Sequence, residues 1–229
     1  MRAFALAVLC SSALVVTGCA SLLAPLQPQS QGLEQRRATP DDRAGALPAA
    51  PAGPSRSVGL PWSGRLDGGV RVPASGPDHV TWDPVLRRSP NRGWRRFGTL
   101  ATVRTVLRVV ADHRRAHPSA PRVVIGDLSR PKGGDFGARY GLPGHASHQS
   151  GVDVDVYLPR RDGRATTPQS AGQVDRRRSR DLLRRFLRAG AGVIFISPEA
   201  GVHDQDRRVR HIPNHDTHMH VRFGPVHPG

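Results

Sequence analysis

Two short stretches hold most of the side chains in this sequence that can bind a metal ion or move a proton. GHASHQSGVDVDVYLP (144–159) carries two histidines and two aspartates, and HDTHMHVRF (215–223) carries three histidines. A zinc site without cysteine takes histidine nitrogens and a carboxylate oxygen, and a catalytic site keeps a fourth position for water. The two stretches therefore predict a zinc site with three protein ligands.

The spacing of these residues predicts a role for each. His148 and Asp155 fit the local part of a zinc site, because the histidine lies in a loop that leads into the strand carrying the aspartate, and His220 is the distant third ligand. A bound zinc lowers the pKa of its water toward about 7 and polarises a carbonyl group. His218, on the same strand face as His220, can act as general base. A protonated His215, at the start of that strand, can stabilise an oxyanion.

Each of these residues also has a simpler interpretation. A lone His-x-His pair is often only a surface feature, and Asp155 can pair with one of the many arginines. Two strands that each carry such groups on one face favour the metal site, since charged side chains on a buried face need a partner or a cation.

The spacing of hydrophobic residues along the chain predicts the helices and strands that position these side chains. Apolar residues at helical spacing predict helices over 98–117 and 175–189, and β-branched or alternating residues predict strands over 122–129, 152–158, 192–197 and 217–223. Alternation over 152–158 places Asp153 and Asp155 on one face. Without a regular βαβ order, the chain is predicted to be α+β, a small and mainly antiparallel sheet with flanking helices and the zinc site on the sheet.

The N-terminal segment predicts export. Residues 1–18 contain Arg2 near the start and then an apolar run. The run is too short to span a bilayer but is typical of a secretory signal. Val-Thr-Gly before Cys19 resembles the end of a bacterial lipoprotein signal, which predicts a lipid anchor on Cys19, with an ordinary signal peptide as the alternative. Residues 19–58 are rich in Ala, Pro, Gly, Gln and Ser and predict a disordered tether, followed by a folded domain over 59–229.

Charge and cysteine content narrow the possible partners. The formal net charge is +16, nearly all of it from arginine. Export excludes nucleic acid as the partner, while positive charge attracts anionic envelope polymers and lipid head groups. Cys10 lies inside the predicted signal, so the mature chain has no internal disulfide and no thiolate metal ligand.

The two histidine-containing stretches resemble a known family. GHASHQSGVDVDV together with HDTHMHVRF resembles the penicillin-insensitive murein endopeptidases, within the wider group of lysostaphin-type, D-alanyl-D-alanine and hedgehog-like zinc metallopeptidases. That group is marked by a His-x6-Asp pair and a later His-x-His. GDLSRPKGG (126–134) also resembles the segment before the first motif of the family. The similarity covers roughly residues 122–223.

The resemblance implies roles for individual residues. It implies the zinc ligands His148, Asp155 and His220, the catalytic His218 and a second active-site histidine at His215. His145 matches a position that binds a second metal in some members. The carboxylate and histidine that would complete such a site are not visible between Asp155 and His215, so we expect His145 to support the first ion or to be a weak ligand.

The implied activity is that of an exported, zinc-dependent murein endopeptidase in the periplasm or cell envelope. Its implied substrate is peptidoglycan, at D-alanyl to meso-diaminopimelyl cross-links. One alternative is a D-Ala carboxypeptidase or dipeptidase, which needs a cationic group near the substrate carboxylate. Another is a non-catalytic lipoprotein that binds zinc or peptidoglycan, and intact His218 and His215 argue against it. No oligomeric state is predicted.

Two further patterns have structural interpretations. The glycines at 133, 134 and 137 predict a tight turn rather than a phosphate-binding loop, because the lysine precedes them. The basic helix over 175–189 predicts an apolar stripe that faces the core and a solvated basic face, with membrane binding as the alternative.

Overall fold

The computed structural model describes residues 48–140 and 145–224. The predicted signal (1–18), the lipidation site Cys19 and most of the predicted tether (19–58) lie outside the described residues. The first strand begins at Arg56, three residues before the domain boundary that the sequence predicts. Within the described part, neither helix is both long and apolar enough to cross a bilayer.

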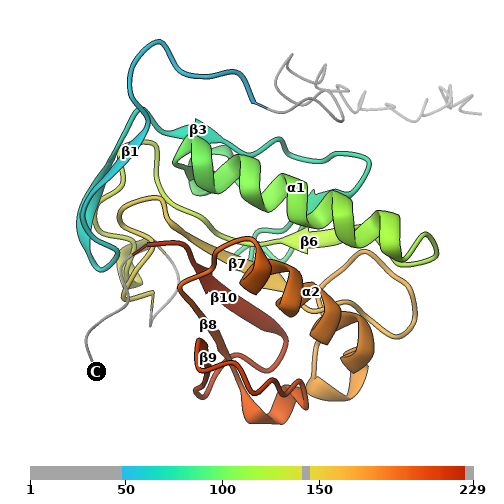
Figure 1. The fold of residues 1–229 in the computed structure, drawn as a ribbon. Helices are drawn as coiled ribbons and strands as arrows, with labels where there is room; N and C mark the ends of the chain where they lie inside the picture. Colours follow the sequence, from blue (N-terminus) through green and yellow to red (C-terminus); the bar gives the residue numbers. More distant parts are fainter. Residues whose placement is uncertain (1–47, 141–144, 225–229) are drawn as a thin grey trace, which may run out of the picture. The chain divides into compact units, whose positions relative to one another are not determined.

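The described chain folds into two helices and a set of short strands (Figure 1). The helices are α1 (Leu100–Ala116) and α2 (Arg176–Arg188). The strands are β1 (Arg56–Leu60), β2 (Ser63–Asp67), β3 (Val70–Arg71), β4 (His79–Thr81), β5 (Phe97–Gly98), β6 (Val123–Ile125), β7 (Asp153–Tyr157), β8 (Val193–Ile196), β9 (Val209–His211) and β10 (His218–Arg222). The predicted α+β class is confirmed.

A six-stranded sheet in the order β4-β6-β7-β10-β8-β9 carries the candidate site. Its inner pairs β6–β7, β7–β10 and β10–β8 are antiparallel, and its outer pairs β4–β6 and β8–β9 are parallel. The sheet is therefore mainly antiparallel, as predicted. The antiparallel pairs β1–β2 and β3–β5 form two separate two-stranded sheets.

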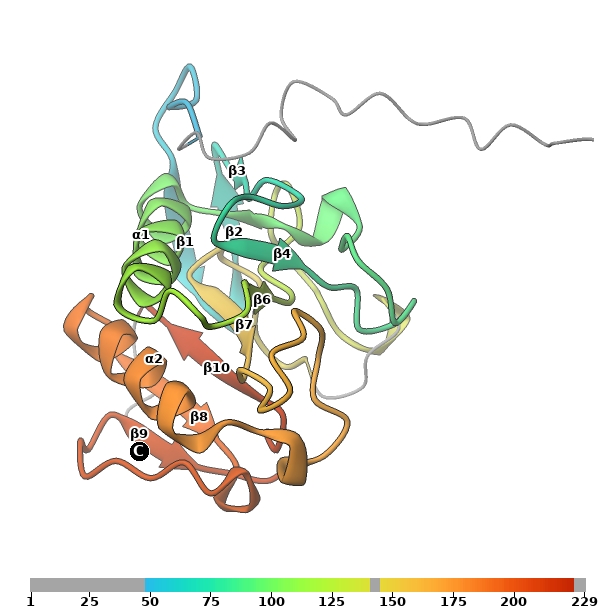
Figure 2. The ribbon, with the colours of Figure 1, turned by 90° about the vertical axis from the view of Figure 1, so that its right-hand side faces the viewer.

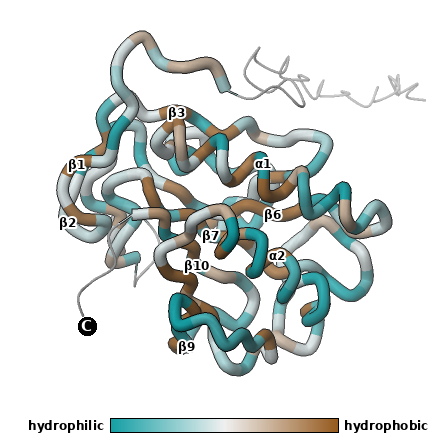
Figure 3. The backbone as a smooth tube through the Cα atoms, viewed as in Figure 1, coloured by the Kyte–Doolittle hydropathy of each residue, from teal (hydrophilic) through white to brown (hydrophobic). Residues whose placement is uncertain are grey.

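Both helices lie on one side of this sheet (Figure 2). Each begins at a side-chain cap, where Thr99 accepts a hydrogen bond from the backbone N–H of Thr102 and Asp175 accepts one from that of Arg178. Their apolar stripes pack on alternate residues of the central strands, which are largely hydrophobic in Figure 3. The core contacts include Val106, Val110, Leu183 and Phe186 on the helices and Val154, Val156, Met219 and Val221 on the strands.

The face of the sheet that packs on the helices determines which face carries the polar residues. Successive side chains of a strand point to opposite faces. Since Val154 and Met219 face the helices, Asp155 and His220 must face away from them. The apolar stripe of α2 also confirms the prediction that this basic helix packs on the core.

A polar cluster that is partly buried joins the two helices. Nδ1 of His113 and Nε2 of His117, both on α1, lie 3.0 Å from the same carboxylate oxygen of Asp181 on α2. Arg185 donates to that oxygen from 2.7 Å. Although these histidine and aspartate atoms are close enough to hold a metal ion, hydrogen-bond lengths and a guanidinium already in place identify a hydrogen-bonded clamp.

We expect this clamp to make stability fall in acid. Burial lowers the pKa of His113 to about 4, against the opposing effect of the Asp181 hydrogen bond. Because this folded-state pKa lies below the unfolded value of about 6.5, the stabilisation is complete above pH 6.5 and is lost as the pH falls toward 4. The expected loss from pH 7 to pH 4 is about 3 kcal/mol of unfolding free energy.

Urea unfolding at pH 7 and pH 4 measures this loss. A His113→Gln variant, which keeps a hydrogen-bonding side chain but cannot titrate, should lose less stability on acidification than the parent protein. His117→Gln is the matched control and should keep most of the pH dependence. Equal pH dependence in the parent and His113→Gln would contradict the assignment.

Candidate metal centre

Antiparallel pairing of β7 with β10 brings the two histidine-containing stretches together. His220 lies opposite Asp155 and Arg222 lies opposite Asp153 in the register of these strands. The side chains alternate in phase on the two strands, so these pairs share the face turned away from the helices. The predicted juxtaposition of the motifs is therefore present in the sheet.

His148 reaches this face from the loop that precedes β7. Its backbone is left-handed, with a φ of 66°, and its N–H donates to Oδ2 of Asp153 over 2.9 Å. Nδ1 of its ring contacts the carbonyl oxygen of Leu128 at 2.5 Å. Since a carbonyl only accepts, Nδ1 carries the proton and Nε2 has its lone pair directed elsewhere. This hydrogen-bond arrangement is typical of histidines that bind metals.

One carboxylate oxygen of Asp155 lies close to both of the other predicted ligands. Oδ1 of Asp155 lies 3.4 Å from Nε2 of His148 and 3.2 Å from Nδ1 of His220. Ligand atoms placed 2.0–2.1 Å from a tetrahedral ion are separated by about 3.3 Å. Both separations are longer than good hydrogen bonds and close to the edge of such a tetrahedron, so these two donor pairs suit a divalent cation.

The second nitrogen of His220 supports the same interpretation. Nε2 lies 3.2 Å from Oδ1 of Asp153, but the two groups are not aligned for a hydrogen bond. This buried nitrogen has no hydrogen-bond partner among the described residues. The contact is close enough for charge attraction. A cation on Nδ1 would place the ring proton on Nε2, where Asp153 can accept it.

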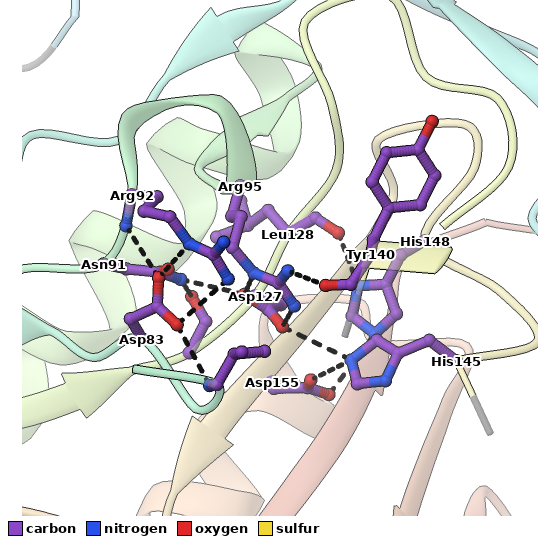
Figure 4. Close-up of polar contacts among 12 residues, drawn as sticks. Asp83, Asn91, Arg92, Arg95, Asp127, Leu128, Tyr140, His145, His148 and Asp155 are labelled. Atoms are coloured by element: carbon purple, nitrogen blue, oxygen red, sulfur yellow. Dashed lines mark hydrogen bonds and ion pairs between the residues drawn. The ribbon is translucent and has the colours of Figure 1, made fainter. Parts of the chain in front are cut away.

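His145 lies beside the same carboxylate. Its Nε2 is 3.3 Å from Oδ2 of Asp155 and 3.5 Å from Oδ2 of Asp127 (Figure 4). His145, His148 and Asp155 each offer a ligand atom, and these atoms lie within 4.8 Å of one another. His145 thus lies beside Asp155, the predicted ligand, and its role at the ion stays a prediction.

A buried network that the sequence analysis missed holds Asp127. Its carboxylate accepts two hydrogen bonds from the guanidinium of Arg95, 2.7 and 2.5 Å long, and one from Asn91 of 2.9 Å. Arg95 is fully buried, with its guanidinium 4.9 Å and 4.8 Å from the ring centroids of Trp94 and Phe136. The one available signal was Asp127 itself, a charged residue two positions after the end of the buried strand β6.

Charge coupling sets the protonation of the centre. Burial favours the neutral form of Asp155, but His148 and His145 outweigh it and hold the pKa of that carboxyl well below its usual range. Burial also opposes a charge on His145 and His220, yet neighbouring aspartates raise both pKa values to about 9. A divalent cation that binds here therefore displaces protons, so its affinity rises with pH.

The donors line a cavity of about 480 Å³ that also contains His215 and His218. The rings of these two histidines lie 4.8 Å apart, and the His215 ring is 6.4 Å from that of His220. Burial lowers the pKa of His218 to about 4 and also lowers that of His215. Both are neutral near pH 7, which suits His218 as a base but disfavours the protonated His215 expected from the sequence.

A tight turn borders the loop that carries His148. Gly133 has a φ of 67°, and a Cβ there would lie 2.1 Å from the carbonyl oxygen of Gln149. The N–H of Gly134 donates to that same oxygen over 2.9 Å. The predicted tight turn is confirmed, and its role is to hold the loop in place.

Comparisons with known proteins agree on one family. The model of the penicillin-insensitive murein endopeptidase family matches residues 57–191. This range includes His145, His148 and Asp155 and ends before the stretch 215–223. Relatives described as penicillin-insensitive murein endopeptidases come from Pectobacterium atrosepticum, Klebsiella pneumoniae and Salmonella paratyphi B.

The relatives are similar over most of this chain. The Pectobacterium protein is 31% identical over 199 residues, which cover 75% of this chain and 66% of that protein. The Klebsiella protein is 31% identical over 134 residues, which cover 55% of this chain and 44% of that protein. The Salmonella protein is 29% identical over 198 residues, which cover 75% of this chain and 67% of that protein. The chain thus spans less than two thirds of the first two relatives.

Proposed function

Because the chain belongs to the penicillin-insensitive murein endopeptidase family, we propose that it hydrolyses amide bonds in the peptide cross-links of murein with a zinc ion held by His148, Asp155 and His220. The observation that carries this proposal is the set of separations around Asp155, 3.2 and 3.4 Å, at the wall of an open cavity. Zinc is the ion that best suits a set of two imidazoles and one carboxylate with a tetrahedral spacing.

The chemistry divides between the ion and the histidines around it. A zinc ion in this position lowers the pKa of its water toward about 7 and polarises the scissile carbonyl group. His218, neutral at working pH, accepts the proton of the attacking water and then delivers it to the leaving amine. His215 donates from Nδ1 to the carbonyl oxygen of Pro213 over 2.8 Å, so its Nε2 faces the reaction as an acceptor that orients water.

Membership of the family supports a proposal for the substrate bond and for the cellular location. We assign the scissile bond to the D-alanyl to meso-diaminopimelyl class, with peptidoglycan as partner, and the location to the periplasm or cell envelope. Residues 1–18 serve as the export signal, Cys19 as the lipid anchor and 19–58 as the tether of a catalytic domain over 59–229. Incorporation of a labelled fatty acid, lost in Cys19→Ser, tests the anchor.

Digestion of purified cross-linked muropeptide dimers by the full chain tests the activity. Dimers should be converted to monomers, a chelator should slow this by at least about 10³-fold because metal activation contributes several kcal/mol to the barrier, and added zinc should restore it. Penicillin should have no effect, since the attacking group is water and no serine is acylated.

The products separate the alternatives. Removal of terminal D-Ala from dimers that stay cross-linked would mean a carboxypeptidase. Intact dimers and termini in a zinc-loaded protein would mean a binding protein without catalysis.

A further inference from the structure

A second hollow lies beside the cavity at the metal centre. A neighbouring depression of about 270 Å³ shares Pro84 and Tyr157 with the cavity that contains the donors. Tyr157 lies opposite His218 on the paired strands, and their rings are 5.7 Å apart. Pro84 and Tyr157 thus border both hollows, and a peptide bound over His218 lies next to the second one.

The walls of the hollow suit a polar, charged part of a peptide. Trp82 and Pro84 form apolar walls, Thr167 and Gln169 add hydroxyl and amide groups, and Arg87 contributes a guanidinium. A guanidinium binds carboxylates with paired N–H groups and remains charged at every working pH. The only formal charge among these lining residues is positive.

The turn that carries Arg87 is held in place from within. Asp83 is buried, and its Oδ1 accepts the backbone N–H groups of Val85 and Leu86 over 3.0 and 2.9 Å. The same carboxylate is paired with Arg92. Arg87 itself has a left-handed backbone, with a φ of 51°. The direction in which this side chain leaves the turn is therefore set by a buried anchor.

The guanidinium is also oriented at its far end. Nη2 of Arg87 donates to Oε1 of Gln169 over 2.7 Å, and Nε2 of Gln169 donates in turn to the backbone and side-chain oxygens of Thr167 over 3.2 Å. Across residues 48–140 and 145–224, no carboxylate lies within ion-pair distance of Arg87. The charge is thus positioned by a neutral amide and is compensated by no acidic group of the described chain.

We propose that this hollow is a substrate subsite in which Arg87 binds a carboxylate of the murein stem peptide. The inference rests on the proposed function, since it concerns the same cleft and the same substrate. It makes Arg87 a determinant of substrate specificity: the residue contributes to binding, at a distance from the reacting atoms, and selects peptides whose carboxylates are free over those in which they are amidated.

Steady-state hydrolysis of two matched dimers tests this assignment. One dimer carries free stem-peptide carboxylates and the other carries the corresponding carboxamides. Arg87→Gln should raise KM for the free-acid dimer about 10-fold with kcat unchanged, the size of one charge-assisted hydrogen bond, and should leave the carboxamide dimer within about two-fold. Arg87→Lys should recover part of the preference.

Arg88→Gln is the matched control, because it removes the same charge from the next, equally exposed residue and should change neither KM. An unchanged KM in Arg87→Gln, or an equal loss on both dimers, would overturn the subsite while leaving the proposed function intact. Failure of the parent protein to cleave either dimer would overturn the proposed function and the subsite with it.

Discussion

His220→Ala is expected to lower kcat/KM on cross-linked muropeptide dimers by at least about 10³-fold and to remove the bound zinc. Nδ1 of this residue lies 3.2 Å from the Asp155 oxygen that also faces His148, so its loss leaves two ligands where a stable tetrahedral site needs three. Metal activation of water supplies several kcal/mol of the barrier reduction, which corresponds to about three powers of ten in rate.

Metal content and activity must be measured together. Zinc per protein molecule, determined by mass spectrometry after dialysis, should fall from near one to near zero in His220→Ala. His211→Ala is a suitable control, because His211 is an exposed histidine on β9 outside the cavity, and it should keep both zinc and activity. A variant at position 220 that retains its zinc would overturn the ligand assignment.

Asp153→Asn is expected to weaken zinc binding by about 10- to 100-fold, the usual effect of losing a partner of a ligating histidine. The carboxylate of Asp153 contacts residues of both histidine-containing stretches. It accepts the backbone N–H of His148 over 2.9 Å, faces Nε2 of His220 at 3.2 Å and pairs with Arg222 over 2.7 Å. Asparagine keeps the size of the side chain but removes the charge that orients the His220 ring.

The loss of a buried ion pair also destabilises the fold, by about 3–5 kcal/mol when one partner is removed. Arg222→Gln separates this effect from metal binding, because it breaks the same pair without touching His148 or His220. We expect Arg222→Gln to lower the unfolding free energy yet keep zinc affinity within a few-fold of the parent. Competition with a chromophoric chelator gives the affinities. Equal zinc affinity in Asp153→Asn and Arg222→Gln would show that Asp153 acts only through the pair.

The sequence could predict those parts of the site that depend on the local alternation of side chains along a strand. Period two along β7 and β10 placed Asp155 and His220 on common faces, and the resemblance supplied their pairing. Both helices lie within two residues of their predicted limits, and their first turns are capped by Thr99 and Asp175. Tyr157 shares the alternation of Asp155, so its place in the cavity could have been predicted by the same argument.

Other parts depend on tertiary contact. Nothing local distinguishes Arg95, which is buried against Asp127, from exposed arginines such as Arg87 and Arg88, since only the burial of Asp127 requires a cation there. The strand predicted over 122–129 ends at Ile125. A Cβ at Gly126 would come within 3.1 Å of the Asp155 side chain. Gly126 and Asp127 still form backbone hydrogen bonds with Asp155, and Ser129 then pairs with Phe97. The strands β3, β4 and β5, two or three residues long, are too short to show a period.

The position of β10 in the sheet ties catalytic competence to the completion of folding. This strand is last in chain order among the described elements, yet it lies between β7 and β8 in the interior of the sheet. It alone carries His218 and His220, so a partly folded chain whose other strands have formed lacks both a zinc ligand and the base. Under the proposed function, the full set of zinc ligands and the base would come together only when this final strand pairs with its two neighbours.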